Sequence, residues 1–156
     1  MTKPSALVVL VHHGDAVPAE IDTQRPLSTH GRRTIERLAA VARGRGVRPD
    51  AVWHSGKLRA KQTAEIVWSA CNPLAEFSAI KGLRPEDPPG IVRDHLAGEA
   101  RVVVLAGHLP QLARLLELLD AGAAPFPPHG MVALELVGDL AWREVWRVAE
   151  PRSAEP

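Results

Sequence analysis

The sequence predicts an α/β fold: a three-layer α/β/α sandwich whose sheet is mostly parallel, with an antiparallel strand near the C-terminus. Three observations support this prediction. Apolar runs of strand length alternate with amphipathic segments along most of the chain. Two of these runs, residues 7–11 and 101–106, are almost entirely apolar and rich in valine, as strands buried on both faces are. The last two strand-like segments, residues 131–137 and 142–148, are separated by the turn signal Gly138-Asp139.

Length and composition are those of one small globular domain. The 156 residues include 19 basic and 18 acidic side chains, a formal charge of +1, and this balance gives no electrostatic basis for binding nucleic acid or an anionic membrane. The single cysteine, Cys71, leaves no internal disulfide, and no apolar run has the length of a membrane span or a signal peptide. We expect one domain over residues 1–149, a frayed tail over residues 150–156, and a cytoplasmic protein.

The first apolar run ends abruptly in His12, His13 and Gly14. In open α/β sheets the chemistry lies just beyond the carboxyl ends of the strands, which is where these histidines fall. Gly14 allows the backbone to turn sharply there, or allows a ligand to approach it closely. A turn residue next to a histidine packed in the core would explain the pair equally well, so this stretch alone leaves both interpretations open.

A long polar loop, residues 15–28, leads to the first expected helix. The proline that follows Arg25 restricts it, so we expect Arg25 to be extended. Ser28 or Thr29 can cap the helix, and Gly44 with the glycine two residues later ends it. Apolar residues three and four positions apart mark its buried face: Ile35, Leu38, Ala39 and Ala42.

A second short strand, residues 51–53, runs into His54-Ser55-Gly56. Ser55 is placed to cap the helix that follows, and Asn72-Pro73 stops that helix. Arg59 lies in or near its first turn, where a positive charge opposes the helix dipole. An anion bound between the helix N-terminus and this arginine would resolve the conflict. A solvated surface arginine is the simpler explanation when Arg59 is considered by itself.

The pattern of strand, loop and helix then repeats. A short strand over residues 75–80 precedes a helix that starts within Pro88-Pro89. The clearest buried strand ends in Gly107-His108, before a helix with inward leucines. A proline-rich loop, residues 123–130, contains His129 and leads into the two C-terminal strands. We expect the four tryptophans to pack mainly in the core: Trp53, Trp68, Trp142 and Trp146.

Polar side chains therefore follow three strands, at one expected edge of the sheet: His12, His13, His54, Ser55 and His108. Arg59 belongs to the same edge, and Arg25 can reach it from the first loop. Arginine forms paired hydrogen bonds with phosphate oxygens and stays charged, while histidine can accept a phosphoryl group or donate a proton. The residues therefore indicate phosphoryl binding or transfer.

Four motifs together resemble those of the histidine phosphatase superfamily, also called phosphoglycerate-mutase-like. Residues 11–16, Val-His-His-Gly-Asp-Ala, are similar to its Arg-His-Gly signature, and residues 25–31 to its Arg-Pro-Leu-Thr-x-x-Gly segment. Residues 55–64 resemble its Ser-Pro-x-x-Arg-Ala-x-Gln-Thr-Ala helix start. Residues 107–110 look like its second histidine motif, in the form found in small SixA-type phosphohistidine phosphatases. The order and spacing fit from residue 7 to about 148, and the combination is highly specific.

The resemblance implies a metal-independent phosphatase with a phosphoglycerate-mutase-like fold and a covalent phosphohistidine intermediate. His13 would attack phosphorus in line, and His108 would stabilise the transferring group. Arg59 and Arg25 would hold its oxygens, with His12 beside them, before water releases phosphate. The resemblance implies no cofactor, and no metal is needed where arginines supply the positive charge. The implied substrate is a phosphorylated protein carrying phosphohistidine, or a small phosphate ester.

Two departures from the family pattern bear on activity. His12 stands where the family has arginine, and it is shorter and charged only when protonated. We expect a protonated His12 to compensate in part, which predicts higher activity at acidic pH. Gly82 stands where the family often has an acid, so Glu86 or Asp87 would have to act as proton donor. A phosphohistidine substrate depends less on such an acid, because imidazole leaves more readily than an alkoxide.

Two other functions are compatible with these residues. The departure at His12 favours a catalytically weak or inactive module that binds phosphate or a phosphoprotein, which predicts binding without turnover. Alternatively, four histidines could hold a metal ion: His12, His13, His54 and His108. The missing carboxylate and cysteine ligands and the nearby arginines argue against a metal site. Metal analysis and sensitivity to chelators would separate it from the other two functions.

Overall fold

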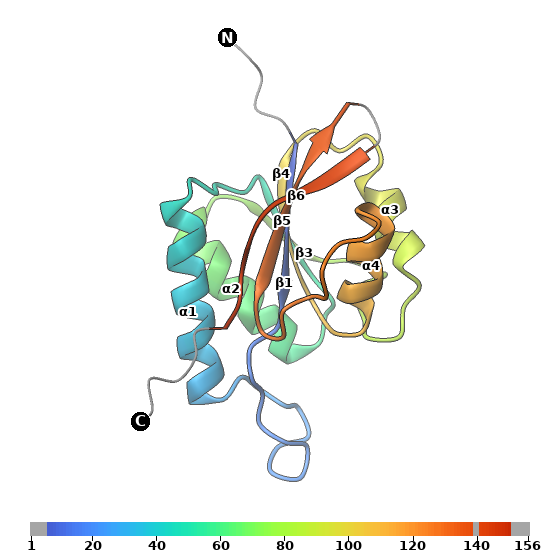
Figure 1. The fold of residues 1–156 in the computed structure, drawn as a ribbon. Helices are drawn as coiled ribbons and strands as arrows, with labels where there is room; N and C mark the ends of the chain where they lie inside the picture. Colours follow the sequence, from blue (N-terminus) through green and yellow to red (C-terminus); the bar gives the residue numbers. More distant parts are fainter. Residues whose placement is uncertain (1–5, 139–140, 151–156) are drawn as a thin grey trace.

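The computed structural model describes residues 6–138 and 141–150, and in this part of the chain six strands form one sheet between two pairs of helices (Figure 1). The sheet order is β3-β2-β4-β1-β5-β6. The elements in chain order are β1 (Leu7–His12), α1 (Thr29–Gly44), β2 (Ala51–His54), α2 (Leu58–Cys71), β3 (Glu76–Ala79), α3 (Pro89–Leu96), β4 (Val102–Gly107), α4 (Gln111–Leu119), β5 (Met131–Val137) and β6 (Ala141–Val148).

The directions of the strands confirm the predicted mixed sheet. Strands β3, β2, β4 and β1 run parallel, and β5 runs antiparallel to both of its neighbours, β1 and β6. Because β5 is antiparallel, it begins where β1 ends, with Met131 opposite Val11. The loop before β5 therefore lies at the same edge of the sheet as the histidines that end β1.

Helices α1 and α2 cover one face of the sheet, and α3 and α4 cover the other (Figure 1). The central strand β1 alternates between the two buried clusters that result. Val9 packs in the cluster that contains Ile35 of α1, and Leu10 packs in the cluster that contains Leu112 of α4. A strand buried on both faces requires the unbroken apolar run seen in the sequence. No helix within the described residues is long and apolar enough to cross a membrane.

Several local expectations are confirmed. Ser28 caps α1, and its side chain accepts a hydrogen bond from the Gly31 N–H (2.9 Å). Helix α3 begins at Pro89. Cys71 is buried and free, and burial raises the pKa of its thiol. Trp53 and Trp142 are buried, and Trp68 and Trp146 are half-buried.

The extended conformation expected for Arg25 is wrong. Its φ is +50°, in the left-handed region. The Arg25 N–H closes a turn on the carbonyl of Asp22 (3.0 Å), and the Arg25 Nε donates to the carbonyl of Val17 (3.1 Å). These bonds within the loop outweigh the local preference for an extended residue before proline. They also hold the guanidinium of Arg25 against the loop.

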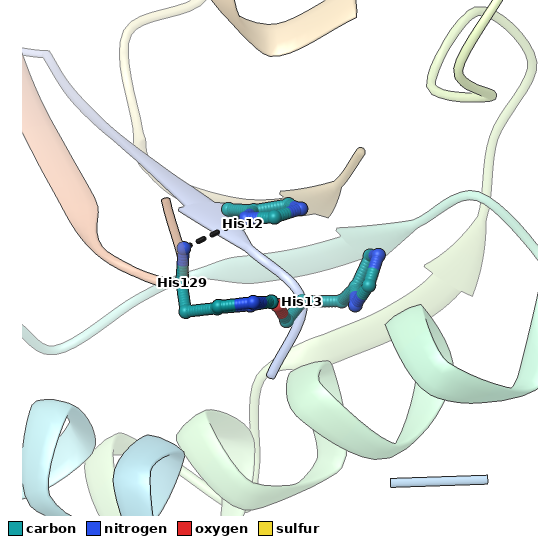
Figure 2. A group of neighbouring side chains, drawn as sticks. All are labelled: His12, His13 and His129. Carbon is teal, nitrogen blue, oxygen red and sulfur yellow. Dashed lines mark hydrogen bonds between the residues drawn. The ribbon is translucent and has the colours of Figure 1, made fainter. Parts of the chain in front are cut away.

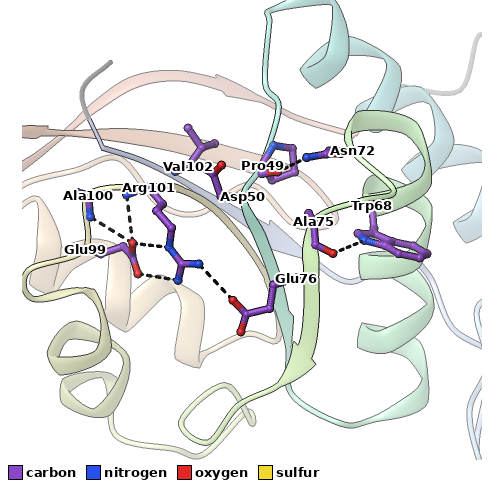
Figure 3. Close-up of polar contacts among 10 residues, drawn as sticks. All are labelled: Pro49, Asp50, Trp68, Asn72, Ala75, Glu76, Glu99, Ala100, Arg101 and Val102. Atoms are coloured by element: carbon purple, nitrogen blue, oxygen red, sulfur yellow. Dashed lines mark hydrogen bonds and ion pairs between the residues drawn. The ribbon is translucent and has the colours of Figure 1, made fainter. Parts of the chain in front are cut away.

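Polar contacts connect the amino ends of the strands, at the edge away from the histidines (Figure 3). Arg101, just before β4, pairs with Glu99 (2.9 Å) and with Glu76 at the start of β3 (3.2 Å). Asp50, just before β2, accepts a hydrogen bond from the Val102 N–H (3.0 Å). These groups lie at the surface, where an ion pair contributes about 0–1 kcal/mol. Glu150, the first residue of the expected tail, accepts a hydrogen bond from His30, and residues 151–156 of that tail lie outside the described residues.

Candidate active site

Three histidines meet where the end of β1 contacts the loop before β5 (Figure 2). The backbone N–H of His129 donates to Nδ1 of His12 (2.7 Å). The ring Nδ1 of His129 donates to the carbonyl oxygen of His13 (2.7 Å). The rings of His12 and His129 stack, with 4.6 Å between their centroids and 14° between their planes. The sequence predicts a loop at His129; the antiparallel direction of the strand that follows is the signal that brings this loop to the end of β1.

His13 has the geometry of a nucleophile. Its Nδ1 lies 2.7 Å from the carbonyl oxygen of Gly14. A carbonyl oxygen only accepts hydrogen bonds, so Nδ1 carries the proton and Nε2 keeps its lone pair. Burial, with a further contribution from the cations of Arg59 and Arg25, lowers the pKa of His13 to about 4. The ring is therefore neutral near pH 7, with Nε2 free to attack.

His12 is in the other neutral tautomer, with its proton on the nitrogen that His13 leaves free. Its Nδ1 accepts a hydrogen bond, so the proton lies on Nε2. Burial and the neighbouring His13 lower the pKa of His12 to about 2. The expectation that a protonated His12 supplies positive charge is therefore wrong, because the ring is buried and its second nitrogen is already an acceptor. His12 offers one neutral N–H donor instead.

His108 follows β4 and lies beside His13, with 5.0 Å between the ring centroids. Its Nε2 is 2.7 Å from the Ser55 Oγ, and that oxygen also accepts the Lys57 N–H (3.2 Å). Its Nδ1 is buried and has no hydrogen-bond partner among the described residues. Burial and the neighbouring His13 lower the pKa of His108 to about 3. The expectation that Ser55 caps α2 is wrong: Lys57 holds the cap position, and Ser55 lies between it and His108.

Two arginines supply positive charge at the site, and the charge of Lys57 also acts on His108. Arg59 lies in the first turn of α2, and its buried Nε has no partner among the described residues. Burial and the charge of Arg25 lower the pKa of Arg59. The charge of Arg25 also lowers the pKa values of His13 and His108. No carboxylate contributes to the pKa shifts of these groups, so the site combines surplus positive charge with unused donors, as an anion requires.

Helix α2 holds both loops of the site in place. Thr63 Oγ1 accepts the Gly14 N–H (3.2 Å) and donates to the carbonyl of Arg59 (2.8 Å). Gln62 Oε1 accepts the Leu27 N–H (2.7 Å), in the loop that carries Arg25. Both side chains belong to the motif over residues 55–64, but the sequence alone indicates no role for either. Because Arg59, Gln62 and Thr63 are spaced three and four positions apart, the arginine and the two side chains that bind the loops lie on one face of α2.

The structure explains why Gly82 stands where an acid was expected. Its φ is +99°, and a Cβ there would lie 2.7 Å from the Ile91 side chain, so no acidic side chain fits on this backbone. Of the two alternative acids, Asp87 lines a cavity of about 540 Å³ together with Ser55. Its Oδ2 accepts the Arg84 N–H (3.0 Å). Glu86 is exposed to solvent and does not line that cavity.

The structure does not bring together the four histidines predicted as a possible metal site, because His54 lies apart from the others. His54 accepts the Gly56 N–H at Nδ1 (3.0 Å) and packs against Phe77 rather than His13. The structure instead groups His12, His13 and His129, with ring nitrogens within 4.8 Å of one another. His12 carries its proton on the nitrogen that a metal would need, so this ring is built as a donor. The hydrogen bonds favour an anion over a metal ion.

The chain also matches known proteins in sequence. Residues 8–85 match the family described as "Histidine phosphatase superfamily (branch 1)". Over 124 residues, 76% of each chain, it is 33% identical to "Phosphohistidine phosphatase SixA" of Escherichia coli K12. The chain belongs to the histidine phosphatase superfamily, branch 1. It is a SixA-like hydrolase of that family, as the four motifs predicted.

Solved structures of this family have the same fold. The histidine phosphatase SixA complexed with tungstate superposes with a TM-score of 0.83 and 27% identity, over 92% of this chain and 97% of that one. A putative phosphohistidine phosphatase SixA from Agrobacterium tumefaciens gives 0.78 and 25%, over 94% and 99%. The phosphoglycerate-mutase-like α/β/α sandwich is therefore confirmed.

Proposed function

We propose that this hydrolase removes phosphate from phosphohistidine in proteins, through a covalent intermediate on His13. The observation that carries the proposal is the hydrogen bond from His13 Nδ1 to the Gly14 carbonyl, which leaves Nε2 as a free nucleophile beside two arginines. The relatives named as phosphohistidine phosphatases support the substrate class. The relative complexed with tungstate, a tetrahedral oxyanion like phosphate, supports the kind of ligand.

The transfer is an in-line displacement at phosphorus. Nε2 of His13 forms a bond to phosphorus as the bond to the substrate imidazole breaks, and the electron pair leaves with that imidazole nitrogen, which takes up a proton. Arg59 and Arg25 neutralise charge on the phosphoryl oxygens. If the Ser55 hydroxyl donates to Nε2 of His108, the buried Nδ1 of His108 carries a proton for the same group. Water then attacks phosphorus, releases phosphate and restores His13.

Asp87 is our candidate for the group that protonates the leaving group, because it lines the cavity next to Ser55. An imidazole leaves more readily than an alkoxide, so it needs this proton less. We therefore expect loss of Asp87 to slow the cleavage of a phosphoserine peptide more than that of a phosphohistidine peptide. Such a difference would separate a proton donor from a residue that only shapes the cavity.

The test is phosphate release from a phosphohistidine peptide and a phosphoserine peptide, by the unmodified protein and by His13→Ala, Asp87→Asn and His95→Ala. We expect His13→Ala to lower turnover by about 10³-fold or more, as loss of a covalent nucleophile does. His95→Ala is the matched control, because this histidine is exposed on α3 and its ring lies beside Trp53 rather than among the clustered histidines. Rapid acid-free quenching should trap phosphate on residue 13 in the unmodified protein.

Two results would overturn the proposal. Turnover that survives in His13→Ala would remove the assigned nucleophile. Tungstate or phosphate binding by the unmodified, folded protein without any turnover would instead identify the binding module that the departure at His12 favours.

A further inference from the structure

We infer that His129 is a positioning residue of the phosphoryl site: it fixes His12 as a neutral N–H donor and ties the backbone of His13 to the loop before β5. This inference rests on the proposed function, because it gives His12 a place in phosphoryl binding. It adds a residue from the far end of the chain that none of the four sequence motifs contains.

The first step is the choice of tautomer at His12. A neutral imidazole can carry its proton on either nitrogen, and the partner of one nitrogen decides the state of the other. The His129 backbone N–H, 2.7 Å from His12 Nδ1, can only donate. It therefore keeps Nδ1 unprotonated and places the proton of His12 on Nε2. In Figure 2 the rings of His12 and His13 extend to the same side of the strand end.

The second step concerns the contacts of the His129 side chain with His12 and His13. Its ring donates to the carbonyl of His13 and stacks on the ring of His12. The peptide group of His13 leads directly to Gly14, whose carbonyl orients the His13 ring. One side chain thus contacts both the donor and the backbone of the nucleophile.

The third step is the backbone of His129 itself. Its φ is +55°, in the left-handed region that few residues other than glycine adopt, histidine and asparagine among them. The neighbouring Gly130 carbonyl accepts the His12 N–H (3.0 Å), so the loop meets β1 just there. Its N–H is bonded to His12 and its ring to the carbonyl of His13, so both groups of this residue are used at the site, which points to a role for the ring.

The charge of the site explains why a neutral donor is useful. Burial lowers the pKa of Arg59, and repulsion from the charge of Arg25 lowers it further. A third cation buried at position 12 would add to this repulsion before any anion is bound. A neutral N–H adds a hydrogen bond to a phosphoryl oxygen without adding charge, provided that its tautomer is held.

The test compares His129→Gly with His129→Asn, since both residues accept the left-handed backbone. Asparagine can still donate to the His13 carbonyl, and glycine cannot. ¹⁵N NMR of labelled histidine reports the tautomer of His12, assigned with a His12→Gln variant, and tungstate binding reports the site. We expect a single Nε2–H tautomer of His12 in the unmodified protein. We expect mixed tautomers in His129→Gly, because without the ring bonded to His13 and stacked on His12 the loop no longer holds the backbone N–H of residue 129 against His12. We expect tungstate affinity to fall about tenfold in His129→Gly and to recover mostly in His129→Asn.

The inference is overturned if His129→Gly keeps both the tautomer and the tungstate affinity, or if His129→Asn is no better than His129→Gly at equal thermal stability. Neither readout requires turnover. Absence of turnover in the unmodified protein, together with the expected tautomers and affinities, would refute the proposed function and leave the role of His129 standing.

Discussion

At the scale of single residues, the chemistry of the site depends on which ring nitrogen carries the proton. His13 donates from Nδ1 to a carbonyl and keeps Nε2 free, whereas His12 accepts at Nδ1 and keeps its proton on Nε2. Two adjacent histidines at one strand end therefore present different groups: a free ring nitrogen on His13 and a ring N–H on His12. The difference comes entirely from their backbone partners, Gly14 and His129.

The donor role of His12 predicts a difference between two substitutions. The side-chain amide of His12→Gln can donate from about the position of Nε2, whereas His12→Ala has no donor. We expect kcat/KM for a phosphohistidine peptide to fall on the order of 10²-fold in His12→Ala and about tenfold in His12→Gln. Steady-state kinetics from pH 5.5 to 8 would check this. A rise of activity at acidic pH that disappears in His12→Gln would contradict a neutral His12.

At the scale of elements, the start of α1 is packed directly against the loop that follows His13. Gly31 lies in the first turn of α1, and a Cβ there would overlap the carbonyl oxygen of Asp15. Gly14 approaches the same turn equally closely: a Cβ there would lie 2.8 Å from the Gly31 carbonyl oxygen. This close approach sets where the loop that carries Arg25 can run.

Two glycines of the same helix make a matched pair for testing this contact. We expect Gly31→Ala to lower the free energy of unfolding by about 1–3 kcal/mol, since the added methyl meets backbone that cannot move aside easily. Gly44→Ala, with nothing within 4 Å of its Cβ, should raise it by up to about 1 kcal/mol through helix propensity. Urea denaturation measures both, and similar values for the two variants would contradict the packing argument.

At the scale of the whole molecule, charge is arranged differently at the two edges of the sheet. The amino ends of the strands carry paired ions around Arg101. The carboxyl ends carry two arginines and neutral, buried histidines. Among the described residues no buried carboxylate neutralises the site, so its positive charge is available to bind a substrate anion.

This arrangement predicts that stability falls in mild acid. The pKa values of His12, His13 and His108 are about 2, 4 and 3 in the folded protein, below the ordinary 6.5. As pH falls below 6.5 the unfolded chain binds protons at these rings and the folded protein does not. Stability is therefore full above pH 6.5 and is lost toward pH 4. Each ring contributes about 1.4 kcal/mol per pH unit, so three cost about 4 kcal/mol by pH 5.5.

Urea unfolding at pH 8, 6.5 and 5.5, with chelator and without phosphate, would measure this loss. His12→Gln should reduce the slope of the unfolding free energy against pH by about a third, since it removes one of the three rings. Tungstate should restore part of the stability, because an anion favours protonated histidine and binds only the folded protein. A stability that stays flat between pH 8 and 5.5 would show that the rings are not held neutral.

Much of the fold could be predicted because its signals are local. The apolar runs that became β1 and β4 have the length and composition of strands buried on both faces, and the two segments before and after Gly138 pair as predicted. Where parallel strands end is also local information, which is why His13, Arg59 and His108 could be placed at one edge. The residues that were misjudged, Arg25 and Ser55, have partners that compete with local preference, and the partner of Ser55 lies 53 positions away.

The sequence by itself therefore determined the layers, the edge that holds the chemistry and the residue types gathered there, since hydrophobic period, strand length and motif spacing are properties of short stretches. Only the tertiary structure decided that His129 joins His12 from 117 positions away, that His12 is a neutral donor, and that Gly82 has no room for an acid. Protonation state and available space depend on what surrounds a side chain, and in a folded chain most of those surroundings are distant in sequence.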